Sequence, residues 1–210
     1  PAPAPPRAAR SRAASHRVYK AFIELGRLLY GTDDALLKEE WEKIIFNERL
    51  DRGESAALVE LGQRVKSAYK DGKAWMAMFG KTGDIVPGFA IQRLASTFKV
   101  SGNPFLKKAF IELGIVIYVV DTYLKAEIDK VLFDERLEHG EIAALEELKE
   151  KVKHDYADGT AWIKLCNKTG DIIPGYKITR LARIFGITGK LDINIKAFLE
   201  LGIAIYGAND

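Results

Sequence analysis

An internal repeat constrains the fold of this chain more than any other feature of the sequence. The stretch KAFIELGRLLYG at 20–31 returns as KAFIELGIVIYV at 108–119 and again as KAFLELGIAIYG at 196–207. A longer segment, 47–102, matches 134–189 with 30 identical residues among 56 aligned positions. This identity indicates a tandem duplication of a unit of roughly 87 residues, the offset between 47 and 134, followed by a third copy of the opening stretch alone.

The repeated unit is predicted to consist of about five helices, separated by glycines and Asp-Gly pairs. The segment 142–156 is the clearest example, with an apolar stripe made of Ile142, Leu145, Leu148, Val152 and Tyr156. Its opposite side carries three Glu–Lys pairs at helical spacing: Glu146–Lys149, Glu147–Lys151 and Glu150–Lys153. No segment shows a convincing strand pattern, so we predict an all-α protein.

The third copy of the opening helix favours one arrangement of the units. A helix that begins each unit also covers the end of the unit before it, so the C-terminal copy would cap unit two, as terminal repeats cap solenoids. The predicted segments are an extended Pro/Ala/Arg-rich tail (1–19), unit one (20–107), unit two (108–195) and a capping helix (196–210). Two separate bundles are the alternative to this solenoid-like or shared-helix packing.

The segment FGKTGDIVPG at 79–88 contains the Gly-Lys-Thr triplet that ends a phosphate-binding loop. The full motif needs a glycine five residues before Gly80, where Trp75 stands, and the second copy has Asn167 in place of Gly80. Both copies keep Lys-Thr-Gly-Asp-Ile-[Val/Ile]-Pro-Gly, in which a glycine suits a helix end and a proline suits a helix start. We therefore predict a helix–turn–helix connector rather than a nucleotide site.

The repeated tryptophans and cations are candidates for a surface or ligand site. The residues concerned are Trp75, Lys81, Arg93, Trp162, Lys168 and Arg180. The main interpretation is structural, because Trp75 and Trp162 open the short fourth helix at equivalent places and a repeated tryptophan usually fills a core. The alternative is a twofold surface site that contacts a pigment or another ligand.

No group of residues suited to catalysis or to metal binding recurs in the repeat, so we predict neither an enzyme nor a metal site. The lone cysteine, Cys166, aligns with Phe79 and is interpreted as a small buried apolar residue. Glu24, Glu112 and Glu200 recur inside the apolar opening helix. We predict that each pairs with an Arg or Lys of an adjoining helix; an ion or pigment ligand is the alternative.

Positive charge is concentrated at the N-terminus. Residues 1–20 hold five cations and no acid, so the overall charge of +3 leaves −2 for the remaining 190 residues. A nucleic-acid-binding body usually has a basic face, so nucleic acid is not a favoured partner. The Pro/Ala/Arg/Ser composition of the tail favours extended or disordered structure. It also resembles an organellar targeting sequence or the stretch after its cleavage site, and its prolines favour a plastid over a mitochondrion.

These features together predict a non-catalytic structural or linker subunit of a large organellar complex. The plastid-like tail points to a photosystem–antenna supercomplex at the thylakoid, on its stroma or lumen side. The predicted partner-binding residues are Arg7, Arg10, Arg12 and Arg17. The longest apolar run, 109–120, is shorter than the ~20 residues that span a bilayer, so any membrane association is predicted to be peripheral.

Two other classes of protein stay open at this stage. One is a helical carrier that binds pigment or lipid between its helices, and the other is an RNA-associated helical-repeat protein of a mitochondrion or plastid. For the favoured structural subunit we predict no intrinsic cofactor, with contact to chlorophyll, carotenoid or lipid only at its periphery.

Overall fold

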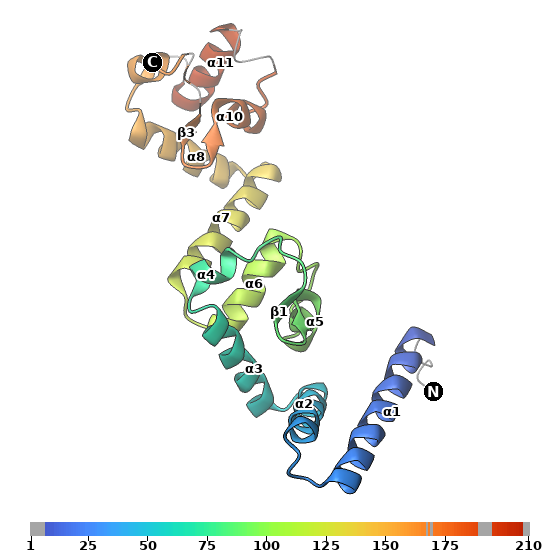
Figure 1. Cartoon of the computed structure of the whole chain (residues 1–210). Helices are drawn as coiled ribbons and strands as arrows, with labels where there is room; N and C mark the ends of the chain where they lie inside the picture. Colours follow the sequence, from blue (N-terminus) through green and yellow to red (C-terminus); the bar gives the residue numbers. More distant parts are fainter. Residues whose placement is uncertain (1–6, 167, 169, 189–194, 208–210) are drawn as a thin grey trace. The chain divides into compact units, whose positions relative to one another are not determined.

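The computed structural model describes residues 7–166, 168, 170–188 and 195–207, and helices make up most of this range (Figure 1). The chain divides into two compact units, Pro1–Lys125 and Ala126–Asp210, with the boundary near the start of one helix, α7 (Thr122–Glu138). The mostly helical content agrees with the predicted fold class.

Seven helices begin in unit one: α1 (Arg7–Tyr30), α2 (Ala35–Asp51), α3 (Ser55–Ala68), α4 (Gly72–Met76), α5 (Ile91–Thr97), α6 (Lys107–Tyr118) and α7. Unit one also contains the strands β1 (Asp84–Val86) and β2 (Phe89–Ala90). Unit two contains most of α7, then α8 (Ile142–Asp155), α9 (Gly159–Ile163), β3 (Asp171–Ile173), β4 (Tyr176–Lys177), α10 (Ile178–Ile184) and α11 (Ile195–Tyr206).

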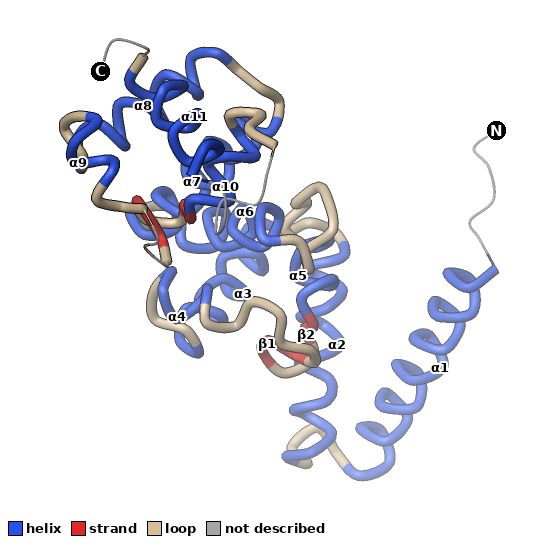
Figure 2. The backbone as a smooth tube through the Cα atoms, turned by 90° about the horizontal axis from the view of Figure 1, so that it is seen from above, coloured by secondary structure: helices blue, strands red, loops and turns tan. Residues whose placement is uncertain are grey.

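The two connectors form short antiparallel hairpins, drawn in red in Figure 2, so the prediction of a helix–turn–helix connector without strands is wrong. Val86 pairs with Phe89 across a two-residue turn made of Pro87 and Gly88. Gly88 has a φ of +79°, the positive value that a type II turn, with proline in its first central position, requires of the next residue. The Asp84 carboxylate accepts a hydrogen bond from the Gly88 N–H at 2.8 Å, and the second hairpin repeats this arrangement.

The N-terminal segment differs from its prediction as an extended tail, because α1 begins at Arg7. Residues 1–6 lie outside the described residues. From Arg7 onward the tail contains alanine, arginine and serine but no proline, and alanine and arginine are among the best helix formers. The prolines that suggested an extended chain are confined to 1–6.

Each unit has its own apolar core. In unit one α6 packs against α3 and α4, and in unit two α11 packs against α8 and α9. On α8, Leu148 and Val152 are fully buried and Leu145 and Tyr156 pack against the same core, as the stripe predicts, whereas Ile142 is 78% exposed at the start of the helix. The three predicted Glu–Lys pairs of α8 are confirmed, with N–O distances of 2.8, 2.9 and 3.5 Å.

Candidate functional site

Trp75 is at the centre of a close contact between α4, α6 and α7, which we call the tryptophan junction. Its ring is fully buried and lies parallel to that of Phe110, with 4.6 Å between the ring centroids. The indole N–H donates a hydrogen bond to the Phe110 carbonyl at 3.0 Å. Trp75 is thus a core residue with its polar atom satisfied, as the main interpretation of the sequence predicts.

Two glycines allow the helices of this junction to approach one another. A Cβ on Gly114 would lie 2.7 Å from the Trp75 ring and 3.0 Å from Leu124. A Cβ on Gly72 would lie 2.5 Å from Leu124. The Asp121 carboxylate accepts hydrogen bonds from the Gly72 N–H at 2.8 Å and from the Leu124 N–H at 2.9 Å. The first turn of α7 is therefore bonded to the start of α4, with a leucine held over the two glycines.

Unit two repeats the first half of this junction. The Trp162 ring lies parallel to that of Phe198, with centroids 5.1 Å apart, and its N–H donates to the Phe198 carbonyl at 3.4 Å. A Cβ on Gly202 would lie 2.8 Å from the Trp162 ring. The three atoms nearest to that position, the third of them at 3.7 Å, all belong to Trp162, whereas at Gly114 Leu124 lies within 3.0 Å.

An apolar pocket of about 280 Å³ occupies this region of unit two. It is lined by Gly159, Trp162, Ile163, Leu199, Gly202, Ile203, Tyr206 and Gly207. Gly159 and Gly202 are the counterparts of the two glycines that Leu124 covers in unit one, which we infer from the alignment of the repeats. The pocket thus corresponds to the site that Leu124 of α7 fills in unit one.

A chain of tyrosines ties each junction to its hairpin. The Tyr118 hydroxyl donates to the Tyr69 carbonyl, and the Tyr69 hydroxyl donates to the Ile85 carbonyl at 2.8 Å. Unit two has the same chain, Tyr206 to Tyr156 at 2.6 Å and Tyr156 to Ile172 at 2.9 Å. Burial raises the pKa of Tyr118 and of Tyr206 to about 12, so both hydroxyls remain donors at neutral pH.

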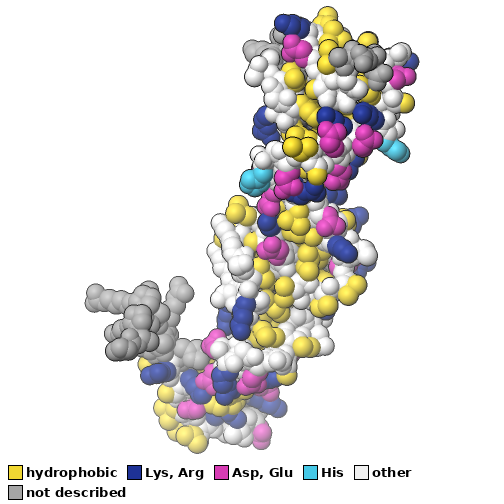
Figure 3. Space-filling view, turned by 180° about the vertical axis from the view of Figure 1, so that it is seen from behind, with side chains coloured by type: hydrophobic (Ala, Val, Ile, Leu, Met, Phe, Trp, Pro, Cys, Tyr) yellow, Lys and Arg dark blue, Asp and Glu magenta, His cyan; other side chains and the backbone are white. Residues whose placement is uncertain are grey.

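Among the described residues, no tryptophan ring stacks on Phe22 of α1, the first copy of this helix. Phe22, Leu25, Leu29 and Tyr30 are 68%, 52%, 69% and 78% exposed, although their counterparts on α6 lie in the junction. We call these four residues the open face of α1. Near Gly26, at the centre of this face, the three atoms nearest to an added Cβ all belong to Leu37, the first of them at 3.1 Å. Figure 3 shows yellow apolar side chains gathered at the lower end of the view, where α1 and α2 meet.

Another side of α1 packs against α2. Ile23 is 4% exposed, and the Arg27 guanidinium lies 4.8 Å from the centre of the Trp41 ring. Lys20 forms an ion pair with Glu48 at 2.7 Å. Because these contacts hold α1 in place without the open face, the exposure of that face does not result from a detached helix.

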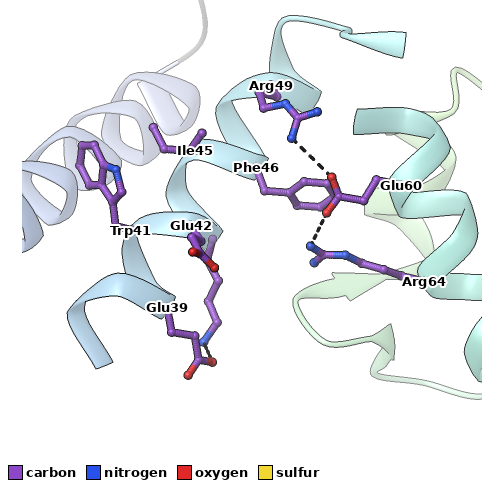
Figure 4. Close-up of a pocket in the computed structure, with 9 residues that line it drawn as sticks. Glu39, Trp41, Glu42, Ile45, Phe46, Arg49, Glu60 and Arg64 are labelled. Atoms are coloured by element: carbon purple, nitrogen blue, oxygen red, sulfur yellow. Dashed lines mark hydrogen bonds and ion pairs between the residues drawn. The ribbon is translucent and has the colours of Figure 1, made fainter. Parts of the chain in front are cut away.

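A groove of about 570 Å³ between α2 and α3 is a second hollow that could hold a ligand (Figure 4). Its cations are neutralised within the groove. Glu60 pairs with Arg64 at 2.7 Å and with Arg49 at 3.4 Å, and Lys43 pairs with Glu39 at 2.7 Å. The Arg64 guanidinium also lies 4.0 Å from the centre of the Phe46 ring. Since these charges are matched, the groove does not attract a charged ligand strongly.

The repeated arginines hold the hairpins. Arg93 donates to the Gly88 carbonyl at 2.8 Å and to the Asn47 side chain at 2.7 Å. Arg180 donates to the Gly175 carbonyl at 3.0 Å and pairs with Asp134 at 2.9 Å. Each arginine thereby joins its hairpin turn to the preceding long helix.

The other predicted residues lie apart from the tryptophans or are exposed. Lys81 and Lys168 are exposed, so the structure does not gather the repeated tryptophans and cations into one surface site. Arg17 is exposed on α1, and Arg7, Arg10 and Arg12 fall in its first two turns.

The remaining candidates do not form a site. Glu24 and Glu200 are exposed, and Glu200 pairs at 3.8 Å with Lys196 of its own helix rather than with an adjoining one. Cys166 is half-buried and free. Within the described ranges no three metal-ligating side chains come together, and no helix there is long and apolar enough to cross a membrane.

No family model, no curated protein and no solved structure matches this chain. The open face of α1 is the feature that sequence reasoning missed. Its signal was present in the repeat, because Phe22, Leu25 and Leu29 align with Phe110, Leu113 and Ile117, which are buried on α6.

Proposed function

We propose that this chain is a non-catalytic helical scaffold that joins protein subunits. In this proposal it is a tandem duplication with shared helices: α6 closes the first bundle and begins the second repeat, and α11 closes the second bundle. The single observation that carries the proposal is the open face of α1, which presents the residues of a helix–helix contact without their partner.

The open face has the composition of a protein contact. Phenylalanine and tyrosine are enriched at interfaces, and contiguous exposed apolar side chains on a folded protein mark sites of association. On α6 the counterparts Phe110, Leu113 and Ile117 are at most 3% exposed against neighbouring helices. The aligned side chains on α1 are therefore suited to contact the helices of another protein rather than solvent.

The narrower placement in a plastid photosynthetic complex rests on the composition of residues 1–20 alone and stays a prediction. With α1 beginning at Arg7, the basic residues would reach a partner from a helix rather than from an extended arm. An acidic neighbour beside the apolar contact would fit this arrangement.

A pigment or lipid carrier is the second candidate, favoured by the apolar pocket beside Trp162. At about 280 Å³ this pocket is at the lower limit for a small-molecule site, so it could bury only part of a large pigment. Pigment or lipid that remains bound to the purified chain, and is lost in the Ile203→Asp variant, would favour the carrier over the scaffold.

The scaffold proposal is tested with the tagged full chain in cells that make it. We expect the wild-type chain to migrate in complexes larger than itself on native gels, and the Phe22→Asp/Leu29→Asp variant to leave them. Val59→Asp is the matched control, because Val59 is 60% exposed on α3 outside the open face. Complexes that persist in the double variant would contradict the proposal.

A further inference from the structure

α1 has the helix of the tryptophan junction and the leucine that follows it, whereas unit two has the tryptophan and, beneath α11, a pocket in place of that leucine. Resting on the proposed function, we propose that the partner of α1 is a second copy of this chain. In this arrangement α1 and the start of α2 from one copy seat on α8 and α9 of another copy, in the place that α11 occupies within its own chain.

α11 already shows how such a helix packs at this site. Its residues Phe198, Leu201 and Ile205 are at most 4% exposed against α8 and α9. The open face of α1 has phenylalanine, leucine and leucine at these three positions, and tyrosine where α11 has Tyr206. α1 therefore carries nearly the same set of side chains for the Trp162 site.

α11 leaves the pocket beside Gly159 unfilled. In unit one Leu124 follows α6 and lies within 3.0 Å of an added Cβ on Gly114. Leu37 follows α1 in the same way and lies within 3.1 Å of an added Cβ on Gly26. When α1 occupies the Trp162 site, the Leu37 side chain therefore lies where the pocket beside Gly159 is now.

A hydrogen bond at the start of the short helix is a further part of the junction. In unit one Asp121 precedes α7 and accepts from the Gly72 N–H at 2.8 Å. Asp34 precedes α2 and already accepts from the Leu36 and Leu37 N–H groups at 3.1 and 3.0 Å, as a capping residue does. Its second oxygen is available for the Gly159 N–H of another copy, in the role that Asp121 has for Gly72.

We call the junction formed between two copies the exchanged junction. It contains a leucine, Leu37, and a carboxylate, Asp34, that α11 does not supply. These additional contacts oppose the advantage that α11 has from being part of the same chain. The contact joins two different surfaces, so it is heterologous and produces either closed rings or open head-to-tail chains.

The first experiment measures self-association of the purified full chain by sedimentation velocity. We expect the wild-type mass to rise from 23.4 kDa to twice that value or more as the concentration increases. Gly26→Ala is the decisive variant, because in its own chain the new methyl group meets only the flexible end of Leu37. In the exchanged junction the same methyl group would meet the Trp162 ring, as an added Cβ on Gly202 does at 2.8 Å.

We expect Gly26→Ala and Phe22→Asp each to weaken association at least about 30-fold, the loss typical of a central interface residue. Val59→Asp should associate as the wild type does. Phe198→Ala should associate more strongly, because it weakens the seat of α11 and not that of α1.

The second experiment locates the contact. A photoreactive phenylalanine derivative replaces Phe22 in the full chain, and this protein is mixed with isotope-labelled wild-type chain. We expect cross-links between position 22 of one copy and residues 142–165 of a differently labelled copy.

The inference is overturned if the wild type and Phe198→Ala both remain at 23.4 kDa up to about 1 mM, a concentration at which specific contacts of ordinary strength form. Cross-links to other segments would also overturn it. If self-association is absent but the open-face variant still leaves its complexes in cells, the scaffold proposal stands with a different partner. If those complexes also persist, both proposals fail.

Discussion

The ring of Trp75 lies parallel to that of Phe110, with 17° between their planes and 4.6 Å between their centroids. Phe110 belongs to α6, the helix with which the second copy of the repeat begins. The compact unit seen in the structure is therefore offset from the unit of the repeat. In each unit a helix with the repeated Lys-Ala-Phe sequence covers the tryptophan, α6 over Trp75 and α11 over Trp162.

Removing this indole should destabilise unit one strongly. We expect Trp75→Ala to lower the free energy of unfolding by about 3–5 kcal/mol, the cost of deleting a large buried aromatic side chain. Trp162→Ala should have a similar effect on unit two. Urea titrations followed by circular dichroism measure both. Val59→Ala, at an exposed position, is the control and should change little; an equal loss for the control would show that the junction is not special.

The repeated glycine should respond differently at its three positions. Gly114→Ala places a methyl group 2.7 Å from the Trp75 ring, so overpacking should cost about 1–3 kcal/mol of unfolding free energy. Gly202→Ala should behave in the same way. Gly26→Ala meets only Leu37 and gains helix propensity, so it should stay within about 1 kcal/mol of the wild type. Thermal unfolding of the three variants tests this order; a large loss at Gly26 would contradict it.

Val119 should be replaceable with a gain in stability. It ends α6 with φ +61° and ψ −58°, a strained γ-turn conformation, and the Val120 N–H donates to the Tyr118 carbonyl at 2.7 Å. The other two copies of the helix are followed by glycine, Gly31 and Gly207, both at positive φ. We expect Val119→Gly to raise the free energy of unfolding by about 1 kcal/mol. Val119→Ala keeps the strain and serves as the control; equal stability of the two variants would contradict this account.

Stability should fall in alkaline solution through the junction tyrosines. Burial raises the pKa of Tyr118 and Tyr206 to about 12 in the folded chain from an ordinary value of 10.0. Their contribution is therefore complete below pH 10 and is lost as the pH rises from about 10 to about 12. Urea midpoints measured across this window should fall less steeply in the Tyr118→Phe/Tyr206→Phe variant than in the wild type.

The double variant will begin from a lower stability, because each phenylalanine leaves a carbonyl without its hydroxyl donor, at a cost of about 1 kcal/mol. Tyr30→Phe, at a 78% exposed position, is the control and should follow the wild-type curve. A double variant whose midpoint falls as steeply as that of the wild type would rule out these tyrosines as the source of the effect.

The helices and the buried tryptophans were predictable because helical periodicity and repeat alignment report them directly. The hairpins were not, because strands of three and two residues are too short to show alternation, and Pro87 suits a turn as well as a helix start. The repeat also predicted that the opening helix covers the end of the preceding unit, but it did not predict whether the face around Phe22 has a partner. A sequence pattern marks a face as apolar, whereas the presence of a partner depends on tertiary packing.

Gly114 contacts both a tryptophan before it and a leucine after it, whereas Gly26 has only the leucine and Gly202 only the tryptophan. An unequal crossover between the two repeats would add or remove one whole period and join equivalent helices to each other. Every new internal junction would then be a copy of the one at Gly114, and the ends would keep α1 and α11. Such an exchange would change the length of the chain in whole periods without requiring a new kind of core.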